Sequence, residues 1–272
     1  MFDTVIEMLS YPFMTRAFLV GSLVALCSAL LGVSLVLKRY SMIGDGLSHV
    51  GFGAMAISAA MNAAPLTVAI PVVIVAAILL LRISGNAKIK GDAAIALIST
   101  TSLAVGVMVI SLTTGMNTDV YNYMFGSILA MSAEDVKLSL VLSVFVLILF
   151  IVFYHKIFAI TFDETFARAT GVKAGVYNTL IAVLTAVTIV LGMRMMGALL
   201  ISSLIIFPAL TSMRVCRTFK SVIINAAVIS VVCLIAGVTL SYVAATPAGA
   251  SVVLANLVMI CLLYTSPSPR DA

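Results

Sequence analysis

The sequence predicts an all-α polytopic membrane protein that crosses the bilayer eight or nine times. Its 272 residues are 63% hydrophobic and 9% charged, with a mean hydropathy of +1.26. Soluble domains average about 45–50% apolar and about 25% charged residues. The apolar residues form continuous runs such as "VLSVFVLILFIVF" at 141–153, whereas a transmembrane β-barrel alternates apolar and polar residues. The runs also have the roughly 17–25 residue length of a helix that spans a bilayer.

The apolar runs place the helices along the chain. We expect helices at residues 13–37, 46–62, 65–82, 92–114, 136–155, 176–194, 197–213, 221–244 and 252–264. Between the fourth and fifth, the apolar part of 116–135 is too short to span, so we expect a short helix there that re-enters the outer face, buried by protein. The last run is short for a span, which leaves both eight and nine crossings open.

The basic residues give the orientation and argue against a nucleic-acid partner. The net charge is +5, but the charges lie in short clusters between apolar runs, as the positive-inside rule requires of cytoplasmic loops. If Lys38 and Arg39 are cytoplasmic, most other basic residues are cytoplasmic too, and Arg16, Lys137 and Arg194 lie outside. The cytoplasmic set also includes Arg82, Lys88, Lys90, Lys156, Arg168, Lys173, Arg214, Arg217 and Lys220.

The chain is predicted to form a single transmembrane domain over residues 1–264, with a polar cytoplasmic loop at about 156–175. The segment "TSPSPRDA" at 265–272 is an atypical tail. Two prolines directly after a short helix would leave backbone groups poorly placed in lipid. We interpret this tail as non-native sequence; a genuine short helix with a disordered tail is the alternative.

The segment "YSMIGDGLSHVGFGA" at 40–54 places Asp45 and His49 on one helix face. One interpretation is structural: Asp45 caps the helix and His49 hydrogen-bonds another helix. The other is that both line a cation pathway, since ionisable groups at membrane depth mark substrate routes. Carboxylate and imidazole together suit a divalent transition metal. Two ligands are too few for a closed site, but a two-fold dimer with the pair near its axis would supply four.

The segment "DETFARATG" at 163–171 has the pattern of a short cytoplasmic helix. Asp163 stands at its start, Glu164 and Arg168 can pair at i, i+4, and Gly171 is placed as a C-terminal stop. The segment is either a docking element or an ordinary loop. No GxxxxGK[ST] run is present, so the chain has no phosphate-binding loop of its own and transport would need an outside energy source.

Five stretches together resemble one family over about residues 5–260. They are "LVLKRYSMIGDGLSH" at 35–49, "DVYNYMFGSILAMSAEDV" at 119–136, "TFDETFARATGVK" at 161–173, "MRMMGALLISSLIIFPALTSMRVCRT" at 193–218 and "TPAGASVVL" at 246–254. In this order and spacing they resemble the membrane permease subunit of bacterial zinc, manganese and iron ABC importers, the ABC-3 metal permease family. One departure is "HVGFGA" after the histidine, where many relatives have Leu-Pro-Gly.

The resemblance implies a type II ABC importer-like permease, homodimeric and multi-pass in the bacterial plasma (inner) membrane. It implies separate cytoplasmic ATPase subunits, an extracytoplasmic metal-binding protein, no catalytic site and no permanent cofactor. The substrate would be zinc or manganese, with iron a further candidate, held by Asp45 and His49. The family's coupling helix corresponds to Asp163, Glu164, Phe166, Ala167, Arg168 and Gly171.

Two other function classes stay open from the residues themselves. A stand-alone secondary cation transporter would use the same Asp45 and His49 pair without any ATPase. An intramembrane hydrolase would need Ser48 or Ser41 to act as a nucleophile with His49. Adjacent side chains on a helix point about 100° apart, which disfavours a bond between Ser48 and His49, and no GxSxG turn is present.

Overall fold

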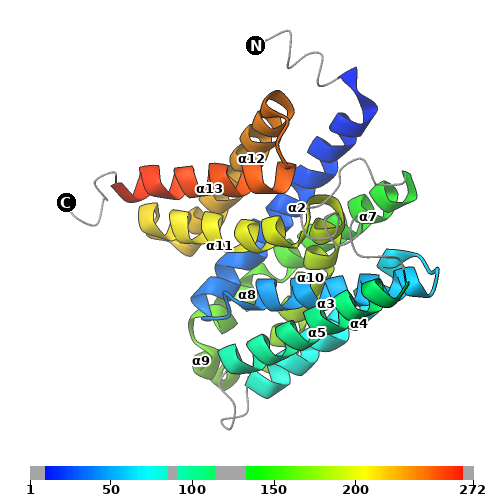
Figure 1. Cartoon of the computed structure of the whole chain (residues 1–272). Helices are drawn as coiled ribbons and strands as arrows, with labels where there is room; N and C mark the ends of the chain where they lie inside the picture. Colours follow the sequence, from blue (N-terminus) through cyan, green and yellow to red (C-terminus); the bar gives the residue numbers. More distant parts are fainter. Residues whose placement is uncertain (1–9, 85–90, 114–132, 266–272) are drawn as a thin grey trace.

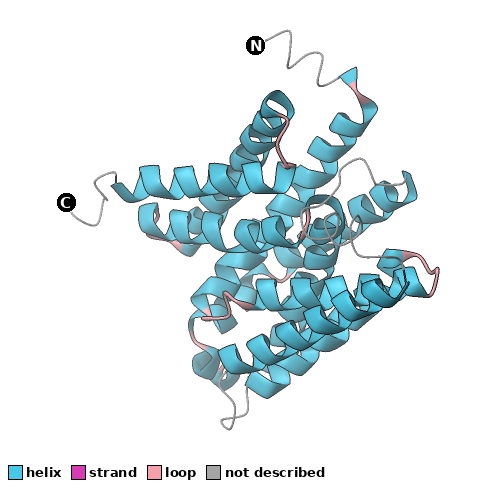
Figure 2. Ribbon diagram, viewed as in Figure 1, coloured by secondary structure: helices cyan, strands magenta, loops and turns pink. Residues whose placement is uncertain are grey.

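The protein, represented here by a computed structural model, is described over residues 10–84, 91–113 and 133–265. All regular structure in these ranges is helical (Figure 2), which confirms the predicted all-α class. The described helices of 18 residues or more are α2 (Pro12–Leu37), α3 (Ile43–Ala60), α4 (Pro65–Ser84), α5 (Gly91–Thr113), α7 (Ala133–Val152), α10 (Ala174–Met196), α11 (Ala198–Val215), α12 (Phe219–Ala244) and α13 (Ala248–Thr265).

Eight of these long helices have the length and hydropathy to cross a membrane, and α3 is the exception. Helix α3 carries both Asp45 and His49, and it packs against α4, α5, α10 and α11. Most of its residues are buried, and Figure 1 shows α3 running alongside α5 and α4. Helix α3 is therefore packed between its neighbours, and the apolar segments of α5, α7 and α13 are mostly not buried, whereas those of α2 and α10 are about two-thirds buried.

Small residues allow α3 and α5 to approach closely. A Cβ built on Gly53 would lie 2.7 Å from the backbone oxygen of Ser102 in α5. Real Cβ atoms almost never come this close to another heavy atom, so only glycine fits this crossing. The close contact fixes α3, and with it the position of Asp45 and His49 relative to the rest of the helices.

Several predicted boundaries differ from the observed ones, each for a local reason. Helix α3 begins at Ile43 instead of residue 46, so Asp45 lies inside the helix. Helix α7 ends at Val152 because the chain turns at Phe153 and starts a new helix, α8 (Tyr154–Phe162). Helix α13 begins earlier than expected, at Ala248, because Pro247 is tolerated just before a first helical turn.

The polar stretch 156–175, expected as a loop, is mostly helical. It contains most of α8 and all of the six-residue α9 (Glu164–Ala169). The re-entrant helix expected within 116–135 lies almost entirely in the segment 114–132, which is outside the described residues. Residues 266–272 of the predicted tail are also outside the described residues.

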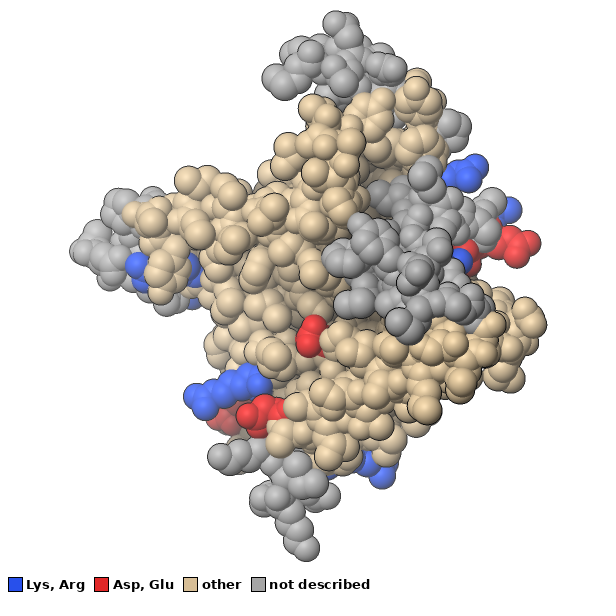
Figure 3. All heavy atoms as spheres, viewed as in Figure 1, with Lys and Arg blue, Asp and Glu red and all other residues tan. Residues whose placement is uncertain are grey.

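The two ends of the helix assembly differ in charge. One end contains a cavity of about 310 Å³. It is lined by Leu37, the last residue of α2, together with Phe162 of α8, Met213 of α11 and Phe219 of α12. Arg217, one of the basic residues expected in the cytoplasm, also lines this cavity. The opposite end holds the ion pair of Arg194 with Asp135, whose side-chain atoms are 3.6 Å apart. Figure 3 shows one face of the molecule that is largely uncharged, with most Lys, Arg, Asp and Glu side chains toward its edges and one acidic group near its middle.

Candidate functional site

Asp45 and His49 lie one turn apart on the same face of α3. His49 Nε2 is 3.8 Å from Asp45 Oδ2, and the Asp45 side chain is 45% exposed compared with 21% for His49. The N-cap residue of α3 is Met42, and Asp45 is the third residue of the helix. Asp45 is therefore not the N-cap, and the capping alternative is wrong because the helix starts three residues earlier than expected.

The Asp45 carboxylate also contacts a distant helix. Ser202 of α11 donates from its Oγ to Asp45 Oδ1 over 3.4 Å and to the Ala198 carbonyl over 3.2 Å. Sequence reasoning did not assign Ser202 to this site, because 157 positions separate it from Asp45 and no local pattern signals the contact. Ser202 orients one carboxylate oxygen and leaves the other directed toward His49.

The serine next to His49 has another partner. The Ser48 hydroxyl donates to the Asp45 backbone carbonyl over 2.7 Å, and the Ser48 side chain is fully buried. Within the described residues, neither Ser41 nor Ser48 is hydrogen-bonded to His49. The nucleophile–base arrangement that a hydrolase needs is thus not formed in this part of the chain.

The geometry of the pair fits two ligands of one metal ion. A ligand nitrogen or oxygen lies about 2.0–2.2 Å from zinc, so two such atoms on one ion are at most roughly 4.4 Å apart. The 3.8 Å between His49 Nε2 and Asp45 Oδ2 is within this limit. No cluster of three or more His, Cys, Asp or Glu side chains occurs among the described residues. Within the part of the chain that the structure describes, Asp45 and His49 therefore offer two ligands for such an ion.

Helix α9 has a complete cap at each end despite its six residues. Asp163 is the N-cap, and its Oδ1 accepts a hydrogen bond from the Phe166 amide over 2.9 Å. At the other end Gly171 adopts φ +85°, a left-handed conformation that favours glycine. The Val172 amide then donates to the Ala167 carbonyl over 2.9 Å. The predicted start and stop signals of this helix are both present.

One face of α9 is anchored and the other is open. Ala167 is fully buried, whereas Phe166 is 65% exposed. The Arg168 side chain is also exposed, at 66%. An exposed phenylalanine next to an exposed arginine, on a short helix fixed from behind, is the type of surface that another protein can bind.

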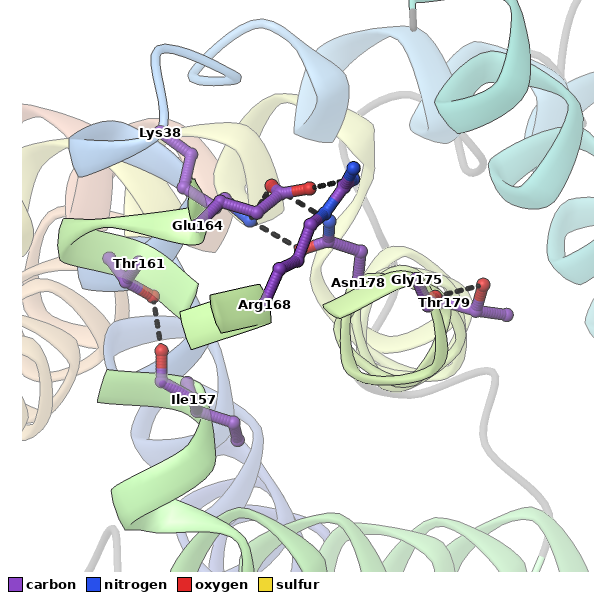
Figure 4. A network of polar contacts seen from close by, with 8 residues as sticks. All are labelled: Lys38, Ile157, Thr161, Glu164, Arg168, Gly175, Asn178 and Thr179. Carbon is purple, nitrogen blue, oxygen red and sulfur yellow. Dashed lines mark hydrogen bonds and ion pairs between the residues drawn. The ribbon is translucent and has the colours of Figure 1, made fainter. Parts of the chain in front are cut away.

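Glu164 connects α9 to two other helices, as Figure 4 shows. Its Oε1 accepts from Arg168 at 2.5 Å, which is the predicted i, i+4 pair. Its Oε2 accepts from Asn178 of α10 over 3.0 Å and lies 3.5 Å from Nζ of Lys38, which follows α2. Lys38 also donates to the Asn178 side-chain oxygen. The contacts form a closed polar network between α2, α9 and α10.

Burial and the neighbouring charges shift the pKa of each residue, Lys38 and Glu164, in opposite directions, and a different one of the two effects prevails at each residue. Burial alone would raise the pKa of Glu164, but the hydrogen bonds from Asn178 and Arg168 and the positive charge of Lys38 outweigh it, so this pKa is lowered. The pKa of Lys38 is also lowered, because burial of the ammonium group outweighs its attraction to Glu164. Burial prevails at Lys38, whose side chain is 11% exposed, and the neighbouring groups prevail at Glu164, whose side chain is 33% exposed.

The polar network is close in sequence to the Asp45–His49 pair. Lys38 is the C-cap residue directly after α2, and a tight turn follows in which Arg39 adopts φ +61° and the Tyr40 amide donates to the Leu35 carbonyl over 2.9 Å. Helix α3 begins directly after this turn, at Ile43. The sequence identifies Lys38 as an orienting charge within the stretch 35–49, but no local pattern predicts its contacts with Glu164 and Asn178, which lie 126 and 140 positions away.

The chain is similar in sequence to membrane proteins of bacterial metal transport systems. The chain is 30% identical over 246 residues to the high-affinity zinc uptake system membrane protein ZnuB of Haemophilus influenzae, covering 90% of this chain and 94% of that protein. It is 31% identical over 269 residues to a probable iron transport system membrane protein of the same organism, covering 98% and 95%. It is 27% identical over 258 residues to the manganese transport system membrane protein MntC of Halalkalibacterium halodurans, covering 95% and 88%.

The fold is also shared with a solved structure. PsaBC from Streptococcus pneumoniae, in complex with Fab, aligns with a TM-score of 0.89 and 27% sequence identity, covering 100% of this chain and 98% of the matched chain. The model of the ABC 3 transport family matches residues 10–266. The packing of α3 against α4, α5, α10 and α11, the eight apolar helices of the described residues and this match over nearly the whole sequence agree, and the chain belongs to the ABC 3 transport family as a multi-pass plasma-membrane permease of metal transport.

Proposed function

We propose that this chain is the permease subunit of an importer that moves a divalent transition metal into the cytoplasm. The metal is zinc or manganese, with iron as the third candidate. Asp45 and His49 hold the ion transiently during its passage. The observation that carries the proposal is the pair itself: a carboxylate and an imidazole 3.8 Å apart on α3, which among the long helices described here is the one without the hydropathy of a membrane span and which packs against four others.

The incomplete ligand set supports a transport role over a storage role. Two ligands from one chain give weak binding, and a transported ion must be released as readily as it is bound. The Asp45 side chain is 45% exposed in the single chain. A homodimer with α3 near its two-fold axis would bring two such pairs together, and water would fill any remaining positions.

Energy for transport is proposed to come from a separate ATPase that contacts α9. The exposed Phe166 and Arg168 supply the contact, and buried Ala167 anchors the helix. Movement of α9 would be passed to α2 through Glu164 and Lys38, and on to α3 through the turn at Arg39. An extracytoplasmic binding protein would deliver the metal to the outer side. This route links the nucleotide-driven step to the metal ligands.

Metal uptake in a strain that lacks its own importer tests the proposal. The strain would produce this chain with its ATPase and binding protein, and uptake of zinc, manganese and iron would be compared at matched membrane expression. We expect wild type to take up one of the three metals, which identifies the substrate, and Asp45→Ala and His49→Ala each to abolish uptake of that metal. Asp92→Ala removes an acidic side chain from the first turn of α5 and is the matched control, with normal uptake expected.

Two results would contradict the proposal. Full uptake in both Asp45→Ala and His49→Ala would place the cation pathway elsewhere in the chain. Transport by the purified chain in vesicles without ATPase or ATP would favour the secondary transporter, which needs only the ion gradient.

A further inference from the structure

A second groove, which does not include Asp45 or His49, is lined by apolar side chains along its length and by His155 and Lys220 at one end. It has a volume of about 570 Å³ and lies between α2, α7, α8 and α12. Its lining residues are Leu30, Phe150, Ile151, Tyr154, His155, Lys220, Ile223 and Ile224. Phe150 and Ile223 are buried and form the floor, while Ile151 and Ile224 are 68% and 54% exposed and form the edges. The groove therefore opens outward between apolar helices.

The polar residues of the groove gather where the helices end. Tyr154 and His155 begin α8, and Lys220 is in the first turn of α12. Both helix starts lie at the end of the assembly that carries α9, since Phe158 and Phe162 of α8 contact Phe219 of α12. The groove thus runs from apolar walls within the membrane to basic groups at the membrane surface.

Lys220 has no partner of opposite charge in the described part of the chain. No ion pair or hydrogen bond of its side chain occurs there, and the first turn of α12 contains no acidic residue. A lysine in a first turn is also at the unfavourable, positive end of the helix dipole. The position is electrostatically suited to an external anion.

We propose that this groove binds an anionic phospholipid of the leaflet on the α9 side. The lipid phosphate pairs with Lys220, with His155 and the Tyr154 hydroxyl beside it, and one acyl chain lies along Ile151 and Ile224. A basic group between transmembrane helices at the membrane surface has the chemistry that recognises anionic headgroups. The apolar channel directly below the charge favours a lipid over a soluble phosphate, because a soluble anion would leave the channel in contact with water.

The chain contains no tryptophan, which allows a local fluorescence test on the full-length protein. Ile151→Trp places a single reporter at the edge of the groove. Val141→Trp places the control reporter on the same helix, at a position that is 62% exposed and outside the groove. Each variant is titrated in detergent with brominated phosphatidylglycerol or brominated phosphatidylcholine, which quench nearby tryptophan.

We expect the groove reporter to be quenched by phosphatidylglycerol with a roughly fivefold preference over phosphatidylcholine, the factor expected for one basic side chain at a membrane surface. The control reporter should show equal quenching by both lipids. Adding Lys220→Gln to the groove reporter should remove the preference, Lys220→Arg should keep it, and Lys173→Gln, which removes an exposed lysine elsewhere, should leave it unchanged.

Four results would overturn the proposal. Equal quenching of the groove reporter by both lipids would mean that the groove holds lipid without headgroup selection. A preference that survives Lys220→Gln, or that also appears at the control reporter, would assign it to general attraction by the basic surface. Absence of quenching by either lipid would mean that protein covers the groove. Displacement of the lipid by inorganic phosphate would identify a soluble anion as the ligand.

Discussion

Nζ of Lys38 lies 3.5 Å from Oε2 of Glu164, which joins the end of α2 to the short helix α9. The two residues are 126 positions apart in the sequence. Glu164 is the acceptor for Lys38, Arg168 and Asn178 together. The carboxylate thus links α9 to the end of α2 and to α10, and its removal leaves a mostly buried ammonium group without an ion-pair partner among the described residues.

Glu164→Ala is expected to destabilise the folded protein by about 1–3 kcal/mol, the usual cost of leaving a buried charged or polar group unpaired. Glu164→Gln keeps an acceptor oxygen and should cost less. Thermal unfolding in detergent measures both. Arg168→Ala removes the exposed member of the network and is the control, with a change below about 1 kcal/mol. Equal stability of Glu164→Ala and wild type would show that the network does not hold α9.

The same network predicts a loss of stability in acid. The folded-state pKa of Glu164 is lowered from its ordinary value of 4.5, so the ionised form is favoured by folding. Its contribution is fully present above about pH 5.5 and decreases as the pH falls through the folded-state pKa. The unfolding temperature of wild type minus that of Glu164→Gln should be constant at neutral pH and shrink below pH 4.5. A difference that is independent of pH would assign the effect of the variant to packing.

Ser202→Ala tests how Asp45 is oriented. The variant removes the hydroxyl that donates to Asp45 Oδ1 over 3.4 Å and leaves both proposed ligands in place. Partners that orient a metal ligand typically contribute 10–100-fold to affinity. Because this hydrogen bond is long, we expect a roughly tenfold rise in the metal concentration for half-maximal uptake. The maximal rate should change less.

Ser203→Ala is the matched control for Ser202→Ala. Ser203 is the next residue of α11, and its hydroxyl donates to the Leu200 carbonyl over 2.8 Å without contacting Asp45. Uptake by this variant should match wild type. A similar loss in both variants would indicate a general disturbance of α11, and normal uptake in both would separate Ser202 from the metal pathway.

The sequence predicts the elements of this protein better than their contacts. Apolar runs are sufficient for the eight described helices that can span the bilayer, because its thickness determines the length of each run. Asp163, Glu164, Arg168 and Gly171 are recognisable because capping and i, i+4 pairing depend on neighbours in the chain. The contact of Ser202 with Asp45 depends on tertiary packing, and no local pattern encodes it.

Some boundaries could not be predicted for the same reason. The turn at Phe153 interrupts an apolar run without any proline or glycine nearby. Tyr154 and Phe153 pack instead against Phe219 and Tyr177, with ring centroids 5.7 and 5.6 Å apart. Aromatic contacts with other helices, which hydropathy does not report, determine where α7 ends and α8 begins.

The close contact between α3 and α5 gives a prediction about packing. Gly53→Ala would place a Cβ 2.7 Å from the Ser102 backbone oxygen, so the two helices must separate. We expect a cost of about 1–3 kcal/mol, as for other over-packed interiors, and reduced metal uptake because α3 carries Asp45 and His49. Thermal unfolding and uptake measure the two effects.

Gly175→Ala makes the same chemical change in α10, where a new Cβ meets nothing within 4 Å. Alanine is the better helix former by roughly 0.5–1 kcal/mol, so this variant should be as stable as wild type or slightly more stable. Uptake should be unchanged. If Gly53→Ala behaved like Gly175→Ala, α3 and α5 could separate freely, and the enclosure of the Asp45–His49 helix would not depend on this glycine.

Because α9 has six residues, its stability is expected to depend on the side chain of its N-cap, Asp163. Asp163→Ala removes the hydrogen bond to the Phe166 amide, and loss of an N-cap typically costs about 0.5–2 kcal/mol. With six residues, α9 has few other backbone bonds to compensate. Hydrogen exchange at Phe166 should be faster by roughly 2- to 30-fold, while Asp163→Asn, which retains a capping oxygen, should stay close to wild type. Unchanged exchange in Asp163→Ala would mean that the anchor at Ala167 and the Glu164 network hold α9 without its cap.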